Sequence, residues 1–120
     1  MYYNDIEDAY QVILLIADVQ EGDSQYEKTI RSNWEKALRQ AQAEIFDSSM
    51  ASKIRTANHG RVPEPQYLNN PVVVGKTKEN NLIALDGSHR IIEHLNKQSQ
   101  RISVIIVDIS WLDDADCMEF

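Results

Sequence analysis

The chain has 120 residues, of which 42% are hydrophobic and 26% are charged, and this composition fits one folded domain rather than a disordered chain. The longest apolar run, Val12 to Ala17, is too short to span a bilayer, no basic signal segment opens the sequence, and the single Cys117 excludes an internal disulfide. The formal net charge of −7 argues against general nucleic-acid binding through a large basic surface. We therefore expect a cytoplasmic protein that does not associate with membranes.

The first half of the chain is predicted to be helical. Apolar residues recur at three- and four-residue spacing from Ile6 to Ala17, which is typical of one face of a helix. A second stripe of this kind runs from Tyr26 to Ile45, and Ser24 with Glu27 has the spacing of a capping box that starts this helix. A third helix is predicted from an N-cap at Asp47 to a stop at Gly60. We expect about three helices in this part.

The second half is predicted to contain most of the β-structure. One strand follows Pro71, and a returning strand covers Leu82 to Leu85. A helix is predicted from about Ser88 to Leu95. The strongest strand, Ile102 to Ile109, is continuous and β-branched, so we expect it to be buried on both faces.

The order of these elements predicts an α+β fold in a single domain spanning residues 1–120. A helical part, residues 1–61, would pack on a small mixed β-sheet. The sheet would come from residues 62–120, in the order β-β-α-β.

A polar turn of unusual composition joins the second strand to its helix. Asp86 is placed to be the N-cap, with its carboxylate accepting from the amide of Ser88 or His89, and Gly87 permits a sharp bend and the close approach of a ligand. The partial positive charge of a helix N-terminus, together with Ser88, His89 and Arg90, favours an anion such as a nucleotide phosphate. The alternative is an ordinary helix cap with no ligand, and the spacing alone leaves both open.

The histidines do not predict a metal site. His89 and His94 are five residues apart, which does not bring them to one helix face, and His59 lies far from both in the sequence. A group of cations falls near the end of the third predicted helix: Lys53, Arg55, His59 and Arg61. A solvated helix face is the favoured interpretation of this group, and a second wall for an anion pocket is the alternative.

The segment from Asn70 to Ile109, NPVVVGKTKENNLIALDGSHRIIEHLNKQSQRISVIIVDI, resembles the ParB/sulfiredoxin-like superfamily, in particular its ParB-like nuclease-type domains. Their pattern is two hydrophobic strands, an Asp-Gly-x-His-Arg turn, a helix and a final strand. In sulfiredoxins the His and Arg of the equivalent Gly-Gly-Cys-His-Arg turn contact ATP phosphates, and in ParB proteins a Gly-x-x-Arg turn helps to bind CTP. The resemblance implies that His89 and Arg90 contact phosphate, that Gly87 and Ser88 allow close backbone approach, and that the ligand is ATP or CTP with Mg²⁺.

The sequence also departs from that superfamily. Ser88 stands where sulfiredoxins have their catalytic cysteine, and a serine cannot perform thiolate chemistry, so reduction of a sulfinic acid is excluded. No helix-turn-helix pattern follows the last strand, so we do not expect a full ParB partition protein. Asp86 and His89 are the candidate catalytic residues, with Asp86 as a base or a Mg²⁺ partner. Whether the chain is an enzyme stays open.

The charge is unevenly distributed along the chain. Residues 1–24 hold six acids and residues 107–120 hold five, both without a base, while residues 25–106 hold eight acids and all 12 bases. Three functions are open: a nucleotide-binding protein with NTPase or phosphotransferase activity, a DNase that uses the basic middle segment, and a non-enzymatic interaction or inhibitor protein of the mobile-element type. The last would dock its acidic ends on a basic partner protein. The sequence does not predict the oligomeric state.

Overall fold

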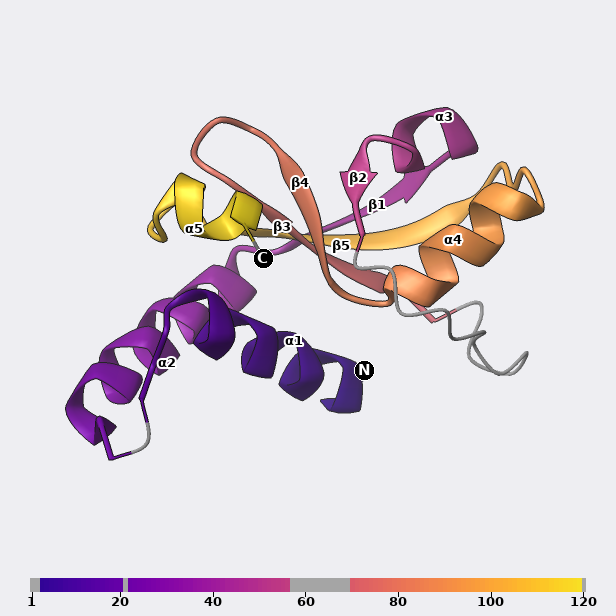
Figure 1. Ribbon diagram of the computed structural model, residues 1–120. Helices are drawn as coiled ribbons and strands as arrows, with labels where there is room; N and C mark the ends of the chain where they lie inside the picture. The colour runs from indigo at the N-terminus through magenta and orange to yellow at the C-terminus, as the bar shows by residue number, and fades with distance from the viewer. Residues whose placement is uncertain (1–2, 21, 57–69, 120) are drawn as a thin grey trace.

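The computed structural model describes residues 3–20, 22–56 and 70–119, which form a five-stranded mixed β-sheet with helices on both faces (Figure 1). The elements in chain order are α1 (Tyr3–Ile16), α2 (Ser24–Arg39), β1 (Gln42–Phe46), α3 (Ser48–Ala51), β2 (Ile54–Arg55), β3 (Val72–Lys76), β4 (Leu82–Asp86), α4 (Ser88–Asn96), β5 (Ile102–Asp108) and α5 (Asp114–Glu119). The predicted α+β class is confirmed. No described helix is long and apolar enough to cross a membrane.

The sheet has the strand order β1-β5-β3-β4-β2. The strand β5 lies between β1, which is antiparallel to it, and β3, which is parallel to it. On the other side of β3, β4 is antiparallel and β2 is parallel to β4. The predicted order of two strands, a helix and a strand in the second half is confirmed. The predicted burial of β5 on both faces is also confirmed, because Val104 and Val107 belong to hydrophobic cores on opposite faces of the sheet.

The first half is less helical than predicted. The helix α2 ends at Arg39, and the residues from Gln42 to Phe46 form β1 on the edge of the sheet, so the prediction of a helix up to Ile45 is wrong. The capping-box prediction is wrong as well, because the N-cap of α2 is Asp23 and its side chain makes no capping hydrogen bond. The hydrogen bonds that β1 gains from β5 outweigh the weak helical periodicity of this short segment.

The third predicted helix is much shorter than expected. Asp47 is its N-cap, as predicted, and Oδ1 of this residue accepts a hydrogen bond from the amide of Met50 at 2.8 Å. The helix α3 ends at Ala51, however, and β2 follows at once to pair with β4. The rest of the predicted helix, from residue 57 to Gly60, lies outside the described residues.

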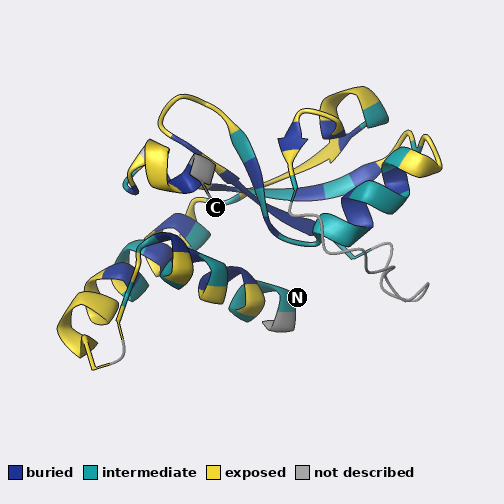
Figure 2. Cartoon of the chain, viewed as in Figure 1, coloured by how far each residue is buried: buried dark blue, intermediate teal, exposed yellow. Residues whose placement is uncertain are grey.

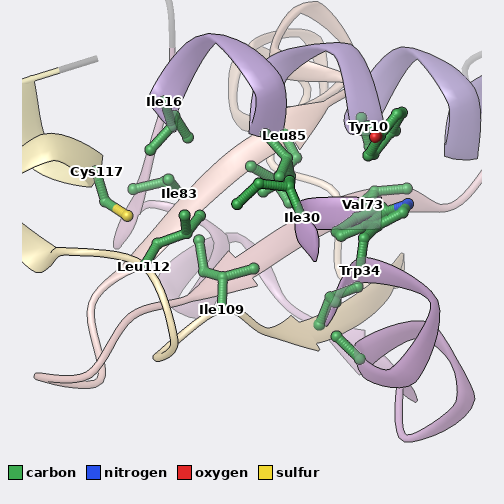
Figure 3. Packing of buried hydrophobic residues seen from close by; sticks show 14 residues of the cluster. Tyr10, Ile16, Ile30, Trp34, Val73, Ile83, Leu85, Ile109, Leu112 and Cys117 are labelled. Carbon is green, nitrogen blue, oxygen red and sulfur yellow. The ribbon is translucent and has the colours of Figure 1, made fainter. Parts of the chain in front are cut away.

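Two hydrophobic cores occupy the two faces of the sheet. The helices α1 and α2 pack on one face around Ile13 and Trp34, and Leu112 and Cys117 bring the C-terminal segment to the same core (Figure 3). The helices α3 and α4 cover part of the other face, where Ile91 packs among strand residues. Figure 2 shows the buried residues concentrated between these layers. The β4–α4 turn lies at one end of this sandwich, next to the N-terminal end of α1.

Candidate functional site

The candidate site is the turn between β4 and α4. The strand ends at Asp86, the helix begins at Ser88, and Gly87 between them is the N-cap with φ of +96°. The prediction that Asp86 caps the helix is wrong. Its carboxylate turns instead to Arg90, one helical turn further on, and Oδ2 accepts a hydrogen bond from Nη2 at 2.8 Å.

Gly87 is needed at this turn for two independent reasons. Its positive φ is a conformation that residues with a Cβ atom adopt only at a cost. A Cβ at this position would also lie 2.8 Å from Nη2 and 2.9 Å from Nε of Arg90, which is closer than van der Waals contact. The sequence predicted that a ligand would approach the glycine closely. In the structure, the guanidinium of Arg90 takes that place.

Arg90 is a buried residue rather than an exposed one at the mouth of the site. Its side chain is only 7% exposed, and Nη2 lies 2.8 Å from Asp86 and 3.5 Å from Oδ1 of Asp5, which comes from the first turn of α1. These three side chains form what we call the Asp5–Asp86–Arg90 cluster. Within the described part of the chain, Nη1 of Arg90 is buried without a hydrogen-bond partner. A buried donor without an acceptor destabilises the folded state by about 1–3 kcal/mol, so this nitrogen could still donate a hydrogen bond to a ligand.

The cluster holds more negative than positive charge. Asp5 and Asp86 are each 18% exposed, and they share a single guanidinium. Burial and the hydrogen bond with Asp5 together raise the pKa of Asp86 to about 7, although the positive charge of Arg90 acts in the opposite direction. A carboxyl group that is buried beside a second acid is costly to ionise, so Asp86 keeps its proton to a higher pH than an ordinary aspartate does.

Ser88 and His89 complete the first turn of α4, and both are half-buried. The structure therefore brings together the five residues that the sequence singled out, from Asp86 to Arg90, and adds Asp5. His94 is at the far end of α4, where its Nδ1 lies 2.9 Å from Oγ of Ser99. No group of three His, Cys, Asp or Glu side chains suited to a metal occurs in the described ranges.

The second wall of cations that we considered for an anion pocket lies partly outside the structure. His59 and Arg61 fall in the undescribed segment. Lys53 and Arg55 are exposed near β2, at the strand that pairs with β4. The cluster thus receives its positive charge from α4 in the described part of the chain.

A small apolar pocket adjoins the cluster. Its volume is about 120 Å³, and Asp5 lines it, so one carboxylate faces both features. The other lining residues come from α1, α2 and the sheet: Ile6, Leu38, Ala41, Pro71, Val73 and Ile105. Pockets for whole drug-sized ligands are typically about 300–1,000 Å³, so this one would accept only a part of such a molecule.

Asp5 is the site residue that the sequence did not predict. Its carboxylate reaches Arg90 because α1 packs across β3 and β4 with its N-terminal end beside the turn. The local pattern around Asp5 gives no sign of this contact, since an acid in a first helical turn is ordinary.

No protein-family model, curated protein or solved structure matches this chain.

Proposed function

We propose that this chain is a nucleotide- or phosphate-binding protein of the ParB/sulfiredoxin-like kind, and that the phosphate binds at the N-terminal end of α4. The observation that carries the proposal is the guanidinium of Arg90. It is held at the glycine turn, almost fully buried, with one nitrogen that has no acceptor. A phosphate oxygen is an acceptor of the right charge for a guanidinium.

The local backbone supports the same ligand. The helix dipole places partial positive charge at the first turn of α4, where an anion is stabilised. The hydroxyl of Ser88 and the imidazole of His89 belong to that turn, and both residues retain partial exposure. Bound phosphate would thus meet one buried cation, the helix N-terminus and two polar side chains.

The apolar pocket favours a nucleotide over free phosphate. Its lining contains no charged residue other than Asp5, and its volume of about 120 Å³ suits one planar ring. Mg²⁺ is usually held by one or two carboxylates together with substrate phosphates, so Asp5 and Asp86 are the residues that would face an ion carried by the nucleotide. If the bound phosphate reacts, Asp86 is the candidate base, since its pKa of about 7 suits proton transfer near neutral pH.

The test is a thermal-shift panel with ATP, CTP, GTP, ADP and inorganic phosphate, each with and without Mg²⁺. A ligand at about 100 times its Kd should stabilise the folded protein by about 2.7 kcal/mol. His89→Ala should abolish the shift, and the unliganded melting temperature of this variant is measured beside that of the wild type, because His89 also has interactions within the fold.

Two controls make the panel decisive. Lys97→Ala removes a cation from the opposite end of α4 and should leave the shift intact. Arg90→Lys keeps the charge but loses the planar fork, and should weaken binding. Arg90→Ala is unsuitable alone, because removing one partner of a buried ion pair typically costs about 3–5 kcal/mol. The proposal is wrong if no ligand in the panel shifts the melting temperature.

A second candidate function rests on the acidic ends of the chain. Leu112 and Cys117 pack in the same core as Ile16, so the C-terminal segment lies beside the end of α1 (Figure 3). The end of the first acidic segment therefore lies near the second acidic segment, with Asp18 and Asp113 exposed. This arrangement favours docking on a basic protein. Reversing the charge of Asp113 and Asp116 should then weaken the docking, whereas His89→Ala should leave it unchanged.

A further inference from the structure

A polar pocket, which we call the interhelical pocket, lies between α1 and α2 and shares no lining residue with the Asp5–Asp86–Arg90 cluster. Its volume is about 410 Å³. The residues that line it are Glu7, Tyr10 and Gln11 from α1, and Ser24, Glu27, Lys28 and Arg31 from α2. Each set recurs at three- and four-residue spacing, so each occupies one face of its helix. Two polar helix faces therefore form the walls of the pocket.

The hydroxyl of Tyr10 has an unused proton at this pocket. The residue is only 3% exposed, and within the described ranges its hydroxyl is buried without a hydrogen-bond partner. The Cζ atom of Arg31 lies 4.3 Å from the centre of the Tyr10 ring, but a guanidinium has no acceptor and cannot take this proton. Burial raises the pKa of Tyr10, so the hydroxyl stays protonated at neutral pH. A buried donor of this kind is stabilised by a ligand that brings an acceptor.

The charges around this hydroxyl place it at the wall of the pocket. The charged groups that act on it are Glu27, Arg31 and Glu7, and all three line the interhelical pocket. Arg31 is already paired, since Nη2 lies 3.0 Å from Oε1 of Glu7 and Nε lies 3.4 Å from Oε1 of Glu35. Glu27 and Lys28 are consecutive and do not face each other, and neither forms an ion pair with another described residue. The pocket thus offers one unpaired carboxylate and one unpaired ammonium.

We propose that the interhelical pocket binds a small zwitterion with a carboxylate and an ammonium group, as in a free amino acid. The ligand carboxylate accepts from the hydroxyl of Tyr10 and pairs with Lys28, and the ligand ammonium pairs with Glu27. A phosphate dianion would be repelled by the two carboxylates of the lining, and a simple amine by its two cations. The face of α2 from Ser24 to Arg31 extends over about 10 Å, which is long enough for such a molecule. This inference is independent of the proposed function, because it concerns a different part of the protein.

The experiment is an NMR titration of the labelled protein with glycine, L-alanine, L-serine and L-glutamine, each up to about 20 mM, which reveals a Kd in the millimolar range. Acetate and methylammonium are titrated beside them, because each carries only one of the two charged groups. At least one amino acid should produce saturable shifts of backbone amides along the two lining faces. Acetate and methylammonium should bind about tenfold or more weakly, since each lacks one charge-assisted hydrogen bond.

Tyr10→Phe removes the hydroxyl and leaves the ring in the core. It should weaken binding of the amino acid by about tenfold or more. Its melting temperature without ligand should equal or exceed that of wild type, because the hydroxyl makes no hydrogen bond in the described fold. Tyr26→Phe is the matched control, since the hydroxyl of Tyr26 donates to the carbonyl of Ala17 at 3.4 Å and does not line the pocket. This variant should bind as wild type does.

Glu27→Gln tests the ammonium end of the ligand. This variant should lose the preference of wild type for amino acids over acetate. The proposal is overturned if no amino acid of the panel causes saturable shifts, if Tyr10→Phe binds as tightly as wild type, or if acetate binds to wild type as tightly as the amino acids do. A lower melting temperature of unliganded Tyr10→Phe than of Tyr26→Phe would also overturn it, because the hydroxyl would then have a partner within the folded chain.

Discussion

Gly87→Ala is expected to destabilise the protein more than its backbone strain alone would explain. The left-handed conformation of this residue costs a side chain with a Cβ about 1–2 kcal/mol. The new methyl group would also lie 2.8–3.1 Å from three atoms of the Arg90 guanidinium. That group cannot move freely, since it is buried and paired with Asp86 and Asp5. Displacing it weakens a buried ion pair, whose complete loss costs about 3–5 kcal/mol. We expect a total of about 3–5 kcal/mol.

Gly22→Ala is the matched control for this prediction. Gly22 has a φ of +89°, almost the same as that of Gly87, but a Cβ there meets no atom within 4 Å. Gly22→Ala should therefore lower the free energy of unfolding by the backbone strain alone, about 1–2 kcal/mol. Urea unfolding at constant pH measures both variants, and the difference between them reports the displacement of Arg90. Equal losses in the two variants would refute the close packing of the guanidinium on Gly87.

Two further substitutions test the packing of the sheet and of α3. Gly75→Ala would place a methyl group 2.6 Å from Cδ1 of Ile109, and we expect the free energy of unfolding to fall by about 1–3 kcal/mol. Adding Ile109→Val, which removes Cδ1, should restore part of this loss, and additive effects of the two substitutions would contradict the clash. Asp47→Ala should lower the free energy of unfolding by about 1 kcal/mol, because it removes the acceptor for the amide of Met50. An unchanged midpoint of urea unfolding would show that α3 does not need this cap.

The β-β-α-β half of the fold could be predicted because its signals are local. The strand from Ile102 to Asp108 is rich in β-branched residues, and the turn at Gly87 separates a strand pattern from a helix pattern. The edge strand β1 could not be predicted in this way. Its apolar residues continue the spacing of α2, and only the pairing with β5, far along the chain, makes the segment extended.

The candidate site was predicted in composition but not in geometry. The sequence places Asp86, Gly87 and Arg90 within one turn, and the structure keeps them together. Their roles differ from the prediction because burial, which sequence spacing does not reveal, turns Arg90 inward and gives Asp86 an ion pair in place of a capping bond. Asp5 joins them only through the packing of α1 on the sheet. Long-range contacts of this kind leave no periodic signal.

The central claim is that an anion binds at the first turn of α4, and amide NMR tests it most directly. A titration of the labelled protein with ATP and Mg²⁺ should produce saturable shifts of the backbone amides of Ser88, His89 and Arg90. The amides of α4 near Asn96 should serve as the internal reference and remain in place. Saturable shifts confined to another surface, or none at a ligand excess, would contradict the claim.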